Sequence, residues 1–310
     1  MKRISLLLPR SVAVTAALAA TLTLAACGGD DPLSTDTGNG DGGDGTTIHV
    51  GSANFPESVV LAEVYAKALE DAGFTVEKTL NIGSREAYLK AMTDTAELDV
   101  FPEYTGNLRL YFDEDATASA PDEVYDELVA ALPDTLTVLE MAPAEDKDAV
   151  VVTQETAAEY SLTSIADLKD VAGDLVLGGP PEWKTRSTGL PGLESVYGVV
   201  FKDFRELDAG GPLTLRALRN GQIDAGNIFS TDPTVASGEL VALEDPEALY
   251  ASQNIVPLVR TEVLDDALEE ALNAVSAALT QEELLALVNA VVADKEDPED
   301  VAADWVDENV

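Results

Sequence analysis

The segment TIHVGSANFPESVVLAEVYAKALEDAGFTVEKTL, residues 47–80, carries the pattern that decides the fold. It begins with the alternating stretch TIHVGSA, which is typical of a β-strand. A helix is predicted next, and Gly73 is a typical stop signal for it. The apolar positions that recur at helical spacing are Val60, Leu61, Val64, Leu69 and Ala72. TVEKTL then predicts a second strand, so the segment reads as a βαβ unit.

The pattern continues to residue 107. Ser84 is expected to cap a short helix, REAYLKAM, and LDVF predicts a third strand, which gives the order βαβαβ of a parallel sheet. We interpret the following PEYTGN, residues 102–107, as a turn. Because ligands bind at the carboxyl ends of strands in open α/β sheets, Tyr104 is predicted to form a binding surface. The alternative is an ordinary turn tyrosine with a buried ring.

A second α/β series follows an acidic helix (residues 122–132) and the strands LTVLEMA and AVVVT. It begins around SIADLKDVAG, and its predicted strands are LVLGG, VVFKDFREL, AGNIF and ELVAL. NIVPLVR then returns as a strand, and two or three helices close the chain. Their starts are indicated by Thr280 with Glu283 and by Asp297 with Pro298. Two α/β series of similar size predict two lobes with a cleft between them, each lobe a mixed, mainly parallel sheet flanked by helices.

The composition excludes several partners. The chain has 310 residues, and 58 acids against 18 bases give a formal net charge of −40. Nucleic acid and anionic membrane surfaces both require Lys and Arg, so neither is an expected partner. Scattered acids of this kind favour a hydrated surface, and a saline habitat is an open alternative.

The first 46 residues predict export and anchoring. Residues 1–26 combine a basic start with an uncharged run from Ser11 to Ala26, shorter than the roughly 20 residues of a membrane-spanning helix, and so predict a signal peptide. The run ends in LAAC, which resembles a bacterial lipobox and makes Cys27, the single cysteine, the lipidated residue. Residues 28–46, rich in Gly and Asp, complete a flexible tether that begins at Cys27. The expected location is the outer face of the bacterial cytoplasmic membrane.

No catalytic or metal-binding pattern stands out. The single histidine, His49, lies inside the first predicted strand, where a structural or surface role is expected. Motifs such as H-E-x-x-H, G-x-S-x-G and the P-loop are missing from the sequence. We therefore expect no enzyme, no metal and no cofactor.

Six segments together resemble the glycine betaine/choline class of substrate-binding proteins of ABC importers. They are GSANFPES (51–58), NIGSREAYLKAM (81–92), DVFPEYTGN (99–107), EWKTRSTGLPGLESVYG (182–198), LRNGQIDAGNIFSTD (218–232) and QNIVPLVR (253–260). The resemblance implies a type II periplasmic-binding-protein clamp that is crossed twice by the chain. Its lobes would be residues 47–147 plus 254–310 and residues 148–253. The implied partners are a small cationic or zwitterionic ligand and membrane permease subunits, with the protein itself a monomer.

The resemblance also implies the ligand-binding residues. Tyr104 aligns with an aromatic cage that holds a quaternary ammonium through π-faces, and Arg186 with the cleft arginine that holds a carboxylate. The chain departs from the family's tyrosines at Asp148, Phe229 and Gln253. Four further residues complete the expected ligand-binding set. The full set is Asn54, Ser84, Arg85, Tyr104, Asn107, Asp148, Arg186, Phe229 and Gln253.

These departures leave the ligand open. Glycine betaine or choline is the family-level expectation, with Asp146 or Asp148 pairing with an ammonium group and Trp183 as a further aromatic candidate. Another betaine, a polar amine or an amino-acid derivative is the alternative. A ligand-sensing lipoprotein without an importer and an extracellular enzyme for a small metabolite are the competing functions.

Overall fold

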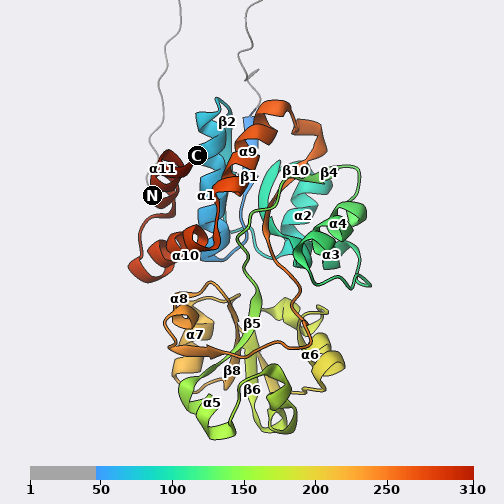
Figure 1. The fold of residues 1–310 in the computed structure, drawn as a ribbon, viewed down its shortest axis with the longest axis vertical. Helices are drawn as coiled ribbons and strands as arrows, with labels where there is room; N and C mark the ends of the chain where they lie inside the picture. Colours follow the sequence, from blue (N-terminus) through green and yellow to red (C-terminus); the bar gives the residue numbers. More distant parts are fainter. Residues whose placement is uncertain (1–46) are drawn as a thin grey trace, which may run out of the picture. The chain divides into compact units, whose positions relative to one another are not determined.

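The computed structural model describes residues 47–310, which form an α/β fold with two five-stranded sheets (Figure 1). The predicted signal peptide, Cys27 and the tether lie outside the described residues. The two-sheet architecture confirms the fold class expected from the sequence.

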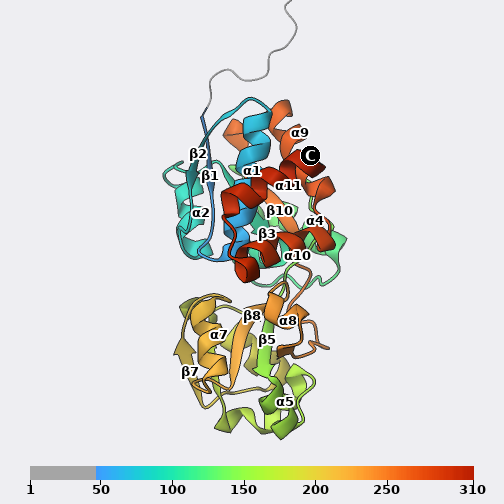
Figure 2. The same cartoon turned by 90° about the vertical axis from the view of Figure 1, so that its left-hand side faces the viewer.

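The first sheet has the strand order β2-β1-β3-β10-β4. Its strands are β1 (Thr47–Gly51), β2 (Thr75–Thr79), β3 (Val100–Tyr104), β4 (Leu136–Val138) and β10 (Ile255–Arg260). The helices that accompany it are α1 (Pro56–Asp71), α2 (Arg85–Thr93), α3 (Thr105–Phe112), α4 (Pro121–Ala131), α9 (Asp266–Ala278), α10 (Gln281–Asn289) and α11 (Pro298–Asn309). We call this sheet with its helices lobe one (Figures 1 and 2).

The second sheet has the order β7-β6-β8-β5-β9. Its strands are β5 (Asp148–Thr153), β6 (Val176–Gly179), β7 (Asp203–Glu206), β8 (Ala225–Phe229) and β9 (Leu240–Ala242). Its helices are α5 (Gln154–Tyr160), α6 (Leu190–Tyr197), α7 (Pro212–Arg219) and α8 (Pro233–Ala236), with the 3-10 turns η1 (Ile165–Asp170), η2 (Ala172–Asp174) and η3 (Pro181–Lys184). We call this sheet with its helices lobe two.

Each sheet is mixed in the same way. In lobe one, β10 pairs antiparallel with β3 and β4, whereas β1 pairs parallel with β2 and β3. In lobe two, β5 pairs antiparallel with β8 and β9, whereas β6 pairs parallel with β7 and β8. The two antiparallel strands follow the two crossings between the lobes: β5 comes after residues 139–147, and β10 comes after residues 243–254 (Figure 1). The remaining strands of each sheet share one direction, so their carboxyl ends form a common edge, where ligands bind in open α/β sheets.

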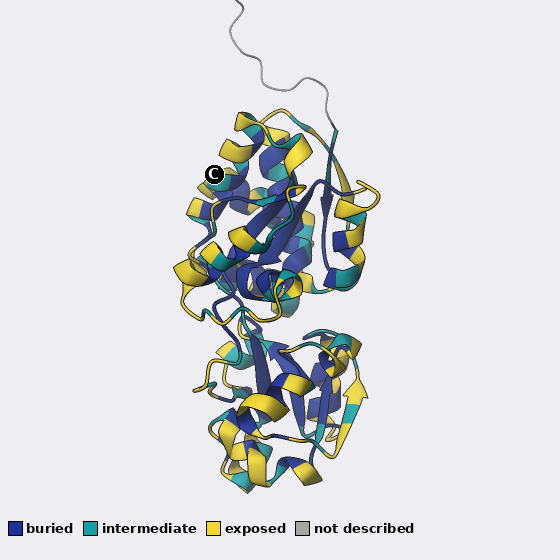
Figure 3. Cartoon of the chain, turned by 90° about the vertical axis from the view of Figure 1, so that its right-hand side faces the viewer, coloured by how far each residue is buried: buried dark blue, intermediate teal, exposed yellow. Residues whose placement is uncertain are grey.

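Both faces of each sheet are buried. On β10, Ile255 and Val259 belong to one apolar cluster and Val256 and Leu258 to another, because successive side chains of a strand point to opposite faces. Two further clusters cover the sheet of lobe two. Figure 3 shows the strands as predominantly buried and the outer helix faces as exposed.

The structure corrects several local predictions. The expected turn at residues 102–107 does not exist, because β3 continues to Tyr104 and α3 begins at Thr105. Ser84 occupies the N-cap position of α2 without a side-chain cap hydrogen bond. The strand predicted from VVFKDFREL is confined to Asp203–Glu206, and the one from LTVLEMA to Leu136–Val138.

Among residues 47–310, no single helix has the length and apolar character needed to cross a membrane, and only α9 with the segment Gln281–Asp294, a pair bent by 89°, passes on length and composition.

Candidate ligand-binding site

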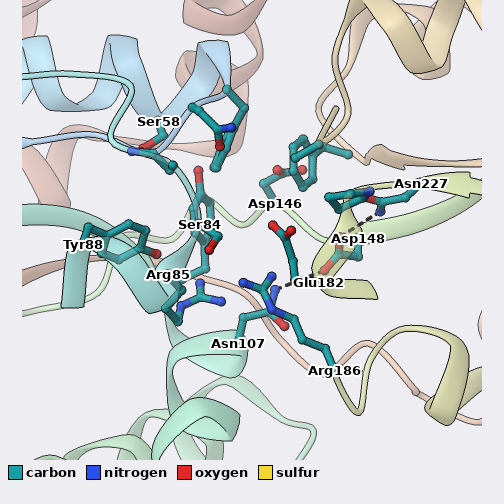
Figure 4. Close-up of a pocket in the computed structure, with 18 of the residues that line it drawn as sticks. Ser58, Ser84, Arg85, Tyr88, Asn107, Asp146, Asp148, Glu182, Arg186 and Asn227 are labelled. Atoms are coloured by element: carbon teal, nitrogen blue, oxygen red, sulfur yellow. Dashed lines mark hydrogen bonds between the residues drawn. The ribbon is translucent and has the colours of Figure 1, made fainter. Parts of the chain in front are cut away.

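A pocket lies where residues of both lobes meet (Figure 4). Lobe one contributes the start of α1, the start of α2 and the end of β3, and lobe two contributes η3 and the facing ends of β5 and β8. Eight of the nine predicted ligand-binding residues line it: Asn54, Ser84, Arg85, Tyr104, Asn107, Asp148, Arg186 and Phe229. Gln253 does not line the pocket, and its side-chain oxygen accepts a hydrogen bond from the backbone N–H of Asn107 at 2.9 Å. In this arrangement Gln253 positions the start of α3, and its contact with a ligand stays a prediction.

Aromatic rings from both lobes form one wall. The ring centroid of Phe55 lies 4.9 Å from that of Phe229 in the other lobe and 6.1 Å from that of Tyr104. Tyr104 is 7% exposed, and its hydroxyl donates to Glu57 at 2.7 Å. Sequence analysis did not assign Phe55 to the site, although it lies in the GSANFPES segment. Such rings suit the methyl groups and positive charge of an alkylammonium.

The Arg85 guanidinium is already paired. Its Nε and Nη2 donate to the two carboxylate oxygens of Glu103 at 2.8 and 2.7 Å, and Glu103 is fully buried. Glu103 also accepts from the hydroxyl of Tyr88 at 2.6 Å and from the backbone N–H of Tyr104. This network fixes the start of α2 against the end of β3.

Arg186 makes an ion pair across the pocket. Its Nη2 lies 3.1 Å from each carboxylate oxygen of Glu86 on α2, so it joins lobe two to lobe one. Burial acts to raise the pKa of Glu86, but the hydrogen bond from Ser84 and the charge of Arg186 outweigh burial and lower it. The predicted carboxylate-binding arginine thus has an internal carboxylate partner.

Asp148 is held between two amides. Asn227 donates to its Oδ1 at 2.8 Å, and Asn107, from lobe one, donates to its Oδ2 at 3.1 Å. Asn227 is 1% exposed, and its Oδ1 is buried without a hydrogen-bond partner in the described part of the chain. Figure 4 shows Asn227 and Asp148 side by side on the lobe-two side of the pocket.

Two buried carboxyl groups, Glu57 and Asp146, lie close together, and Asp146 also lines the pocket. Thr231 donates its hydroxyl to Glu57 at 2.6 Å and its backbone N–H to Asp146 at 3.1 Å. Asp146 also accepts from the hydroxyl of Ser230. Desolvation raises the pKa of Glu57 to about 7, and burial together with the charge of Glu57 raises the pKa of Asp146 well above its usual value. The pair therefore favours retention of a proton near neutral pH.

Glu182 and Trp183 complete the lobe-two side. Trp183 is 1% exposed and stacks on Tyr250 with 6.3 Å between ring centroids, which indicates a core position at the edge of the pocket. Glu182 is half-buried, and its carboxylate takes part in no ion pair or hydrogen bond within residues 47–310. Figure 4 shows its side chain between Asp146 and Arg186. Glu182 was not among the predicted ligand-binding residues, although it lies in the EWKTRSTGLPGLESVYG segment.

Within residues 47–310, no cluster of His, Cys, Asp and Glu could hold a metal ion. His49 lies in β1, and its Nδ1 lies 2.9 Å from Asp99.

Comparison with known proteins matches this architecture. Residues 46–308 match the family model of the substrate-binding domain of ABC-type glycine betaine transport systems. The chain is 29% identical over 273 residues to the glycine betaine-binding protein YehZ of Escherichia coli (strain K12), a match that covers 84% of this chain and 89% of that protein. It is 28% identical over 279 residues to a glycine-betaine-binding protein of Pseudomonas aeruginosa, covering 85% and 88% of the two chains.

A solved structure described as a glycine betaine/carnitine/choline ABC transporter aligns with a TM-score of 0.65 at 20% identity. The alignment covers 84% of this chain and 98% of that chain, and it supports the two-sheet fold.

Proposed function

The chain belongs to the family of substrate-binding domains of ABC-type glycine betaine transport systems, and we propose that its pocket captures a small cationic or zwitterionic ligand of the glycine betaine or choline type. The observation that carries this proposal is the pairing of aromatic faces with carboxylates in one pocket. Phe55, Tyr104 and Phe229 supply the faces, and Asp148 and Glu182 supply negative charge. Together they offer an alkylammonium both methyl contacts and electrostatic attraction.

The proposed mechanism is closure of a clamp around the ligand. The movable units would be residues 47–147 plus 254–310 and residues 148–253, joined by the two crossing segments. Three polar contacts support closure, since each joins one lobe to the other: Thr231 with Glu57, Arg186 with Glu86, and Asn107 with Asp148. A ligand that touches both lobes would favour this closed arrangement over an open one.

The proposed setting is the outer face of a bacterial cytoplasmic membrane. Cys27 would carry a lipid anchor, and the loaded monomer would deliver its ligand to membrane permease subunits. The protein would bind and release its ligand unchanged, without acting as an enzyme.

A ligand screen tests the proposal. The full chain is heated with glycine betaine, choline and related amines, followed by calorimetric titration of every compound that raises the melting temperature. A ligand at 100 times its dissociation constant is expected to stabilise the fold by about 2.7 kcal/mol. Chromatography of the ligand after incubation should recover it chemically unchanged. Binding of none of the betaines and amines, or turnover of one of them, would refute the proposed function.

A further inference from the structure

The charges that line the pocket do not balance. The two arginines at its wall are each matched by a carboxylate from lobe one: Arg85 by buried Glu103 and Arg186 by Glu86. Three carboxyl groups of the lining, Asp146, Asp148 and Glu182, have no cationic partner among residues 47–310. Burial and the charge of Glu57 raise the pKa of Asp146 and favour its protonated form, so Asp148 and Glu182 are the two negative charges that remain. The lining therefore has an excess of negative charge, and a ligand with net positive charge would offset it.

The hydrogen-bonding groups of the pocket are also unbalanced, because two acceptors lack a donor. Glu182 has no donor in the described part of the chain, and neither has the buried Oδ1 of Asn227. The orientation of the Asn227 amide is fixed, because its Nδ2 must face Asp148 at 2.8 Å. Exchange of the amide oxygen and nitrogen would place two oxygens against each other, so the orphaned atom is an acceptor. A buried polar atom without a partner is unfavourable, which implies that a ligand supplies the donor.

We propose that the ligand is a net cation that carries no carboxylate and presents at least one N–H donor, and that Glu182 is the residue that selects it. This inference rests on the function proposed above: it keeps a small cationic ligand in the same pocket, but it replaces the quaternary ammonium of glycine betaine and choline with an amine that carries an N–H. A protonated primary, secondary or tertiary amine meets both requirements, since it brings positive charge to Glu182 and Asp148 and a donor to the pocket's free acceptors.

Two ligand features are disfavoured by the same geometry. A trimethylammonium group has no N–H, so it gains the aromatic contacts but leaves the acceptors unsatisfied. A ligand carboxylate would meet Asp148 and Glu182 as like charges, and it would have to compete with Glu86 for Arg186. The aromatic wall suits N-methyl groups in either case, so a partly methylated amine uses all the features of the pocket.

Three compounds that differ by one feature each test the proposal. Choline and N,N-dimethylethanolamine differ in one N-methyl group that becomes N–H, and choline and glycine betaine differ in the alcohol that becomes a carboxylate. Calorimetric titration of the full chain at pH 7 is expected to give the tightest binding for dimethylethanolamine, weaker binding for choline and the weakest for glycine betaine. Each step is expected to change the dissociation constant about tenfold.

The variant Glu182→Gln keeps the shape of the side chain and removes its charge. It should weaken dimethylethanolamine and choline about tenfold while leaving glycine betaine unchanged or improved. The matched control is Glu194→Gln, an exposed glutamate of α6 in the same lobe, which should leave all three affinities as in the wild type. Circular dichroism melting of each variant verifies the fold.

The outcomes separate this inference from the proposed function. If glycine betaine binds most tightly and Glu182→Gln leaves the order unchanged, the ligand class and the role of Glu182 are wrong while the binding function stands. If none of the three compounds nor any other amine binds, both proposals fail.

Discussion

Thr231 of lobe two donates its hydroxyl to Glu57 of lobe one at 2.6 Å, so a hydrogen bond between buried groups connects the two lobes beside the ligand pocket. Thr231 also donates its backbone N–H to Asp146, which places two carboxyl groups around one threonine. Of these three residues Asp146 lines the pocket, whereas Glu57 and Thr231 hold the two lobes together without lining it.

Replacement of Thr231 by Val should weaken this connection. The methyl group preserves the shape of the side chain but leaves Glu57 without one of its two donors, and a buried group that loses a partner costs about 1–3 kcal/mol. Urea unfolding at pH 8 should show the loss. Thr137→Val, which removes only an exposed hydroxyl contact with Thr261, is the control and should change stability little. Equal stability of the two variants would mean that the Thr231–Glu57 bond contributes nothing.

Stability should also depend on pH through Glu57. Its pKa rises from 4.5 to about 7 on folding, so between these values the folded protein binds more protons than the unfolded chain. The free energy of unfolding then falls as pH rises from 4.5 to 7, by on the order of 3 kcal/mol from this group, and the effect is complete above pH 7. Glu57→Gln should flatten this part of the profile, measured by urea unfolding at several pH values. A variant profile parallel to that of the wild type would contradict the assignment.

Several strands were predictable because their signals are local. AGNIF coincides with β8, residues 225–229, because a short apolar run between a turn and a polar segment is typical of a buried strand. TVEKT forms β2 at the sheet edge, and Gly73, with a φ of 96°, follows the end of α1 as its stop signal predicts. The motif residues also gather as expected, because the carboxyl ends of strands share one edge.

The pairing of charges could not be predicted in the same way. The partners of Arg186 and Thr231 lie 100 and 174 residues away in sequence, and 58 acidic residues are available to 18 basic ones. Only the folded structure shows that Glu103 pairs with Arg85 and Glu86 with Arg186. It also shows that Glu182 has no cationic partner among residues 47–310. The PEYTGN segment was misread for a related reason. Its Pro, Gly and Asn are typical of turns, but pairing with β10 keeps Tyr104 in a strand.

Anchoring is expected to depend on Cys27, which lies outside the described residues. Cys27→Ser removes the thiol that would carry the lipid, and acyl chains contribute about 0.8 kcal/mol of membrane affinity per buried CH₂ group. Cell fractionation should find the variant in the medium or as an unprocessed precursor. A variant that remains in the detergent-soluble membrane fraction like the wild type would refute the lipobox interpretation.

Tyr104 combines a ring at the pocket with a hydroxyl bonded to Glu57. Tyr104→Phe keeps the ring, so affinity for choline should stay within about threefold while stability falls by about 1 kcal/mol. Tyr104→Leu removes the π-face and should weaken choline binding by about 0.5–2 kcal/mol. Calorimetry of the two variants separates the contributions. Equal affinities in both would show that the ring does not contact the cation.

The last prediction concerns the Arg186–Glu86 pair, because it decides whether the arginine can serve a ligand. With Nη2 of Arg186 3.1 Å from both carboxylate oxygens, Glu86 occupies the positions that a ligand carboxylate would take. Glu86→Gln should release Arg186 and increase affinity for glycine betaine by about threefold to tenfold, with choline affinity unchanged, since a charge-assisted bidentate contact becomes available only to the carboxylate. Glu206→Gln, which frees Lys184 at an exposed site of the same lobe as Arg186, removes one negative charge and controls for the change in net charge. Titration of both ligands against both variants measures the effect. Unchanged glycine betaine affinity in Glu86→Gln would show that Arg186 acts only to hold the lobes together, whereas weaker binding of both ligands would show that the pair is needed for closure.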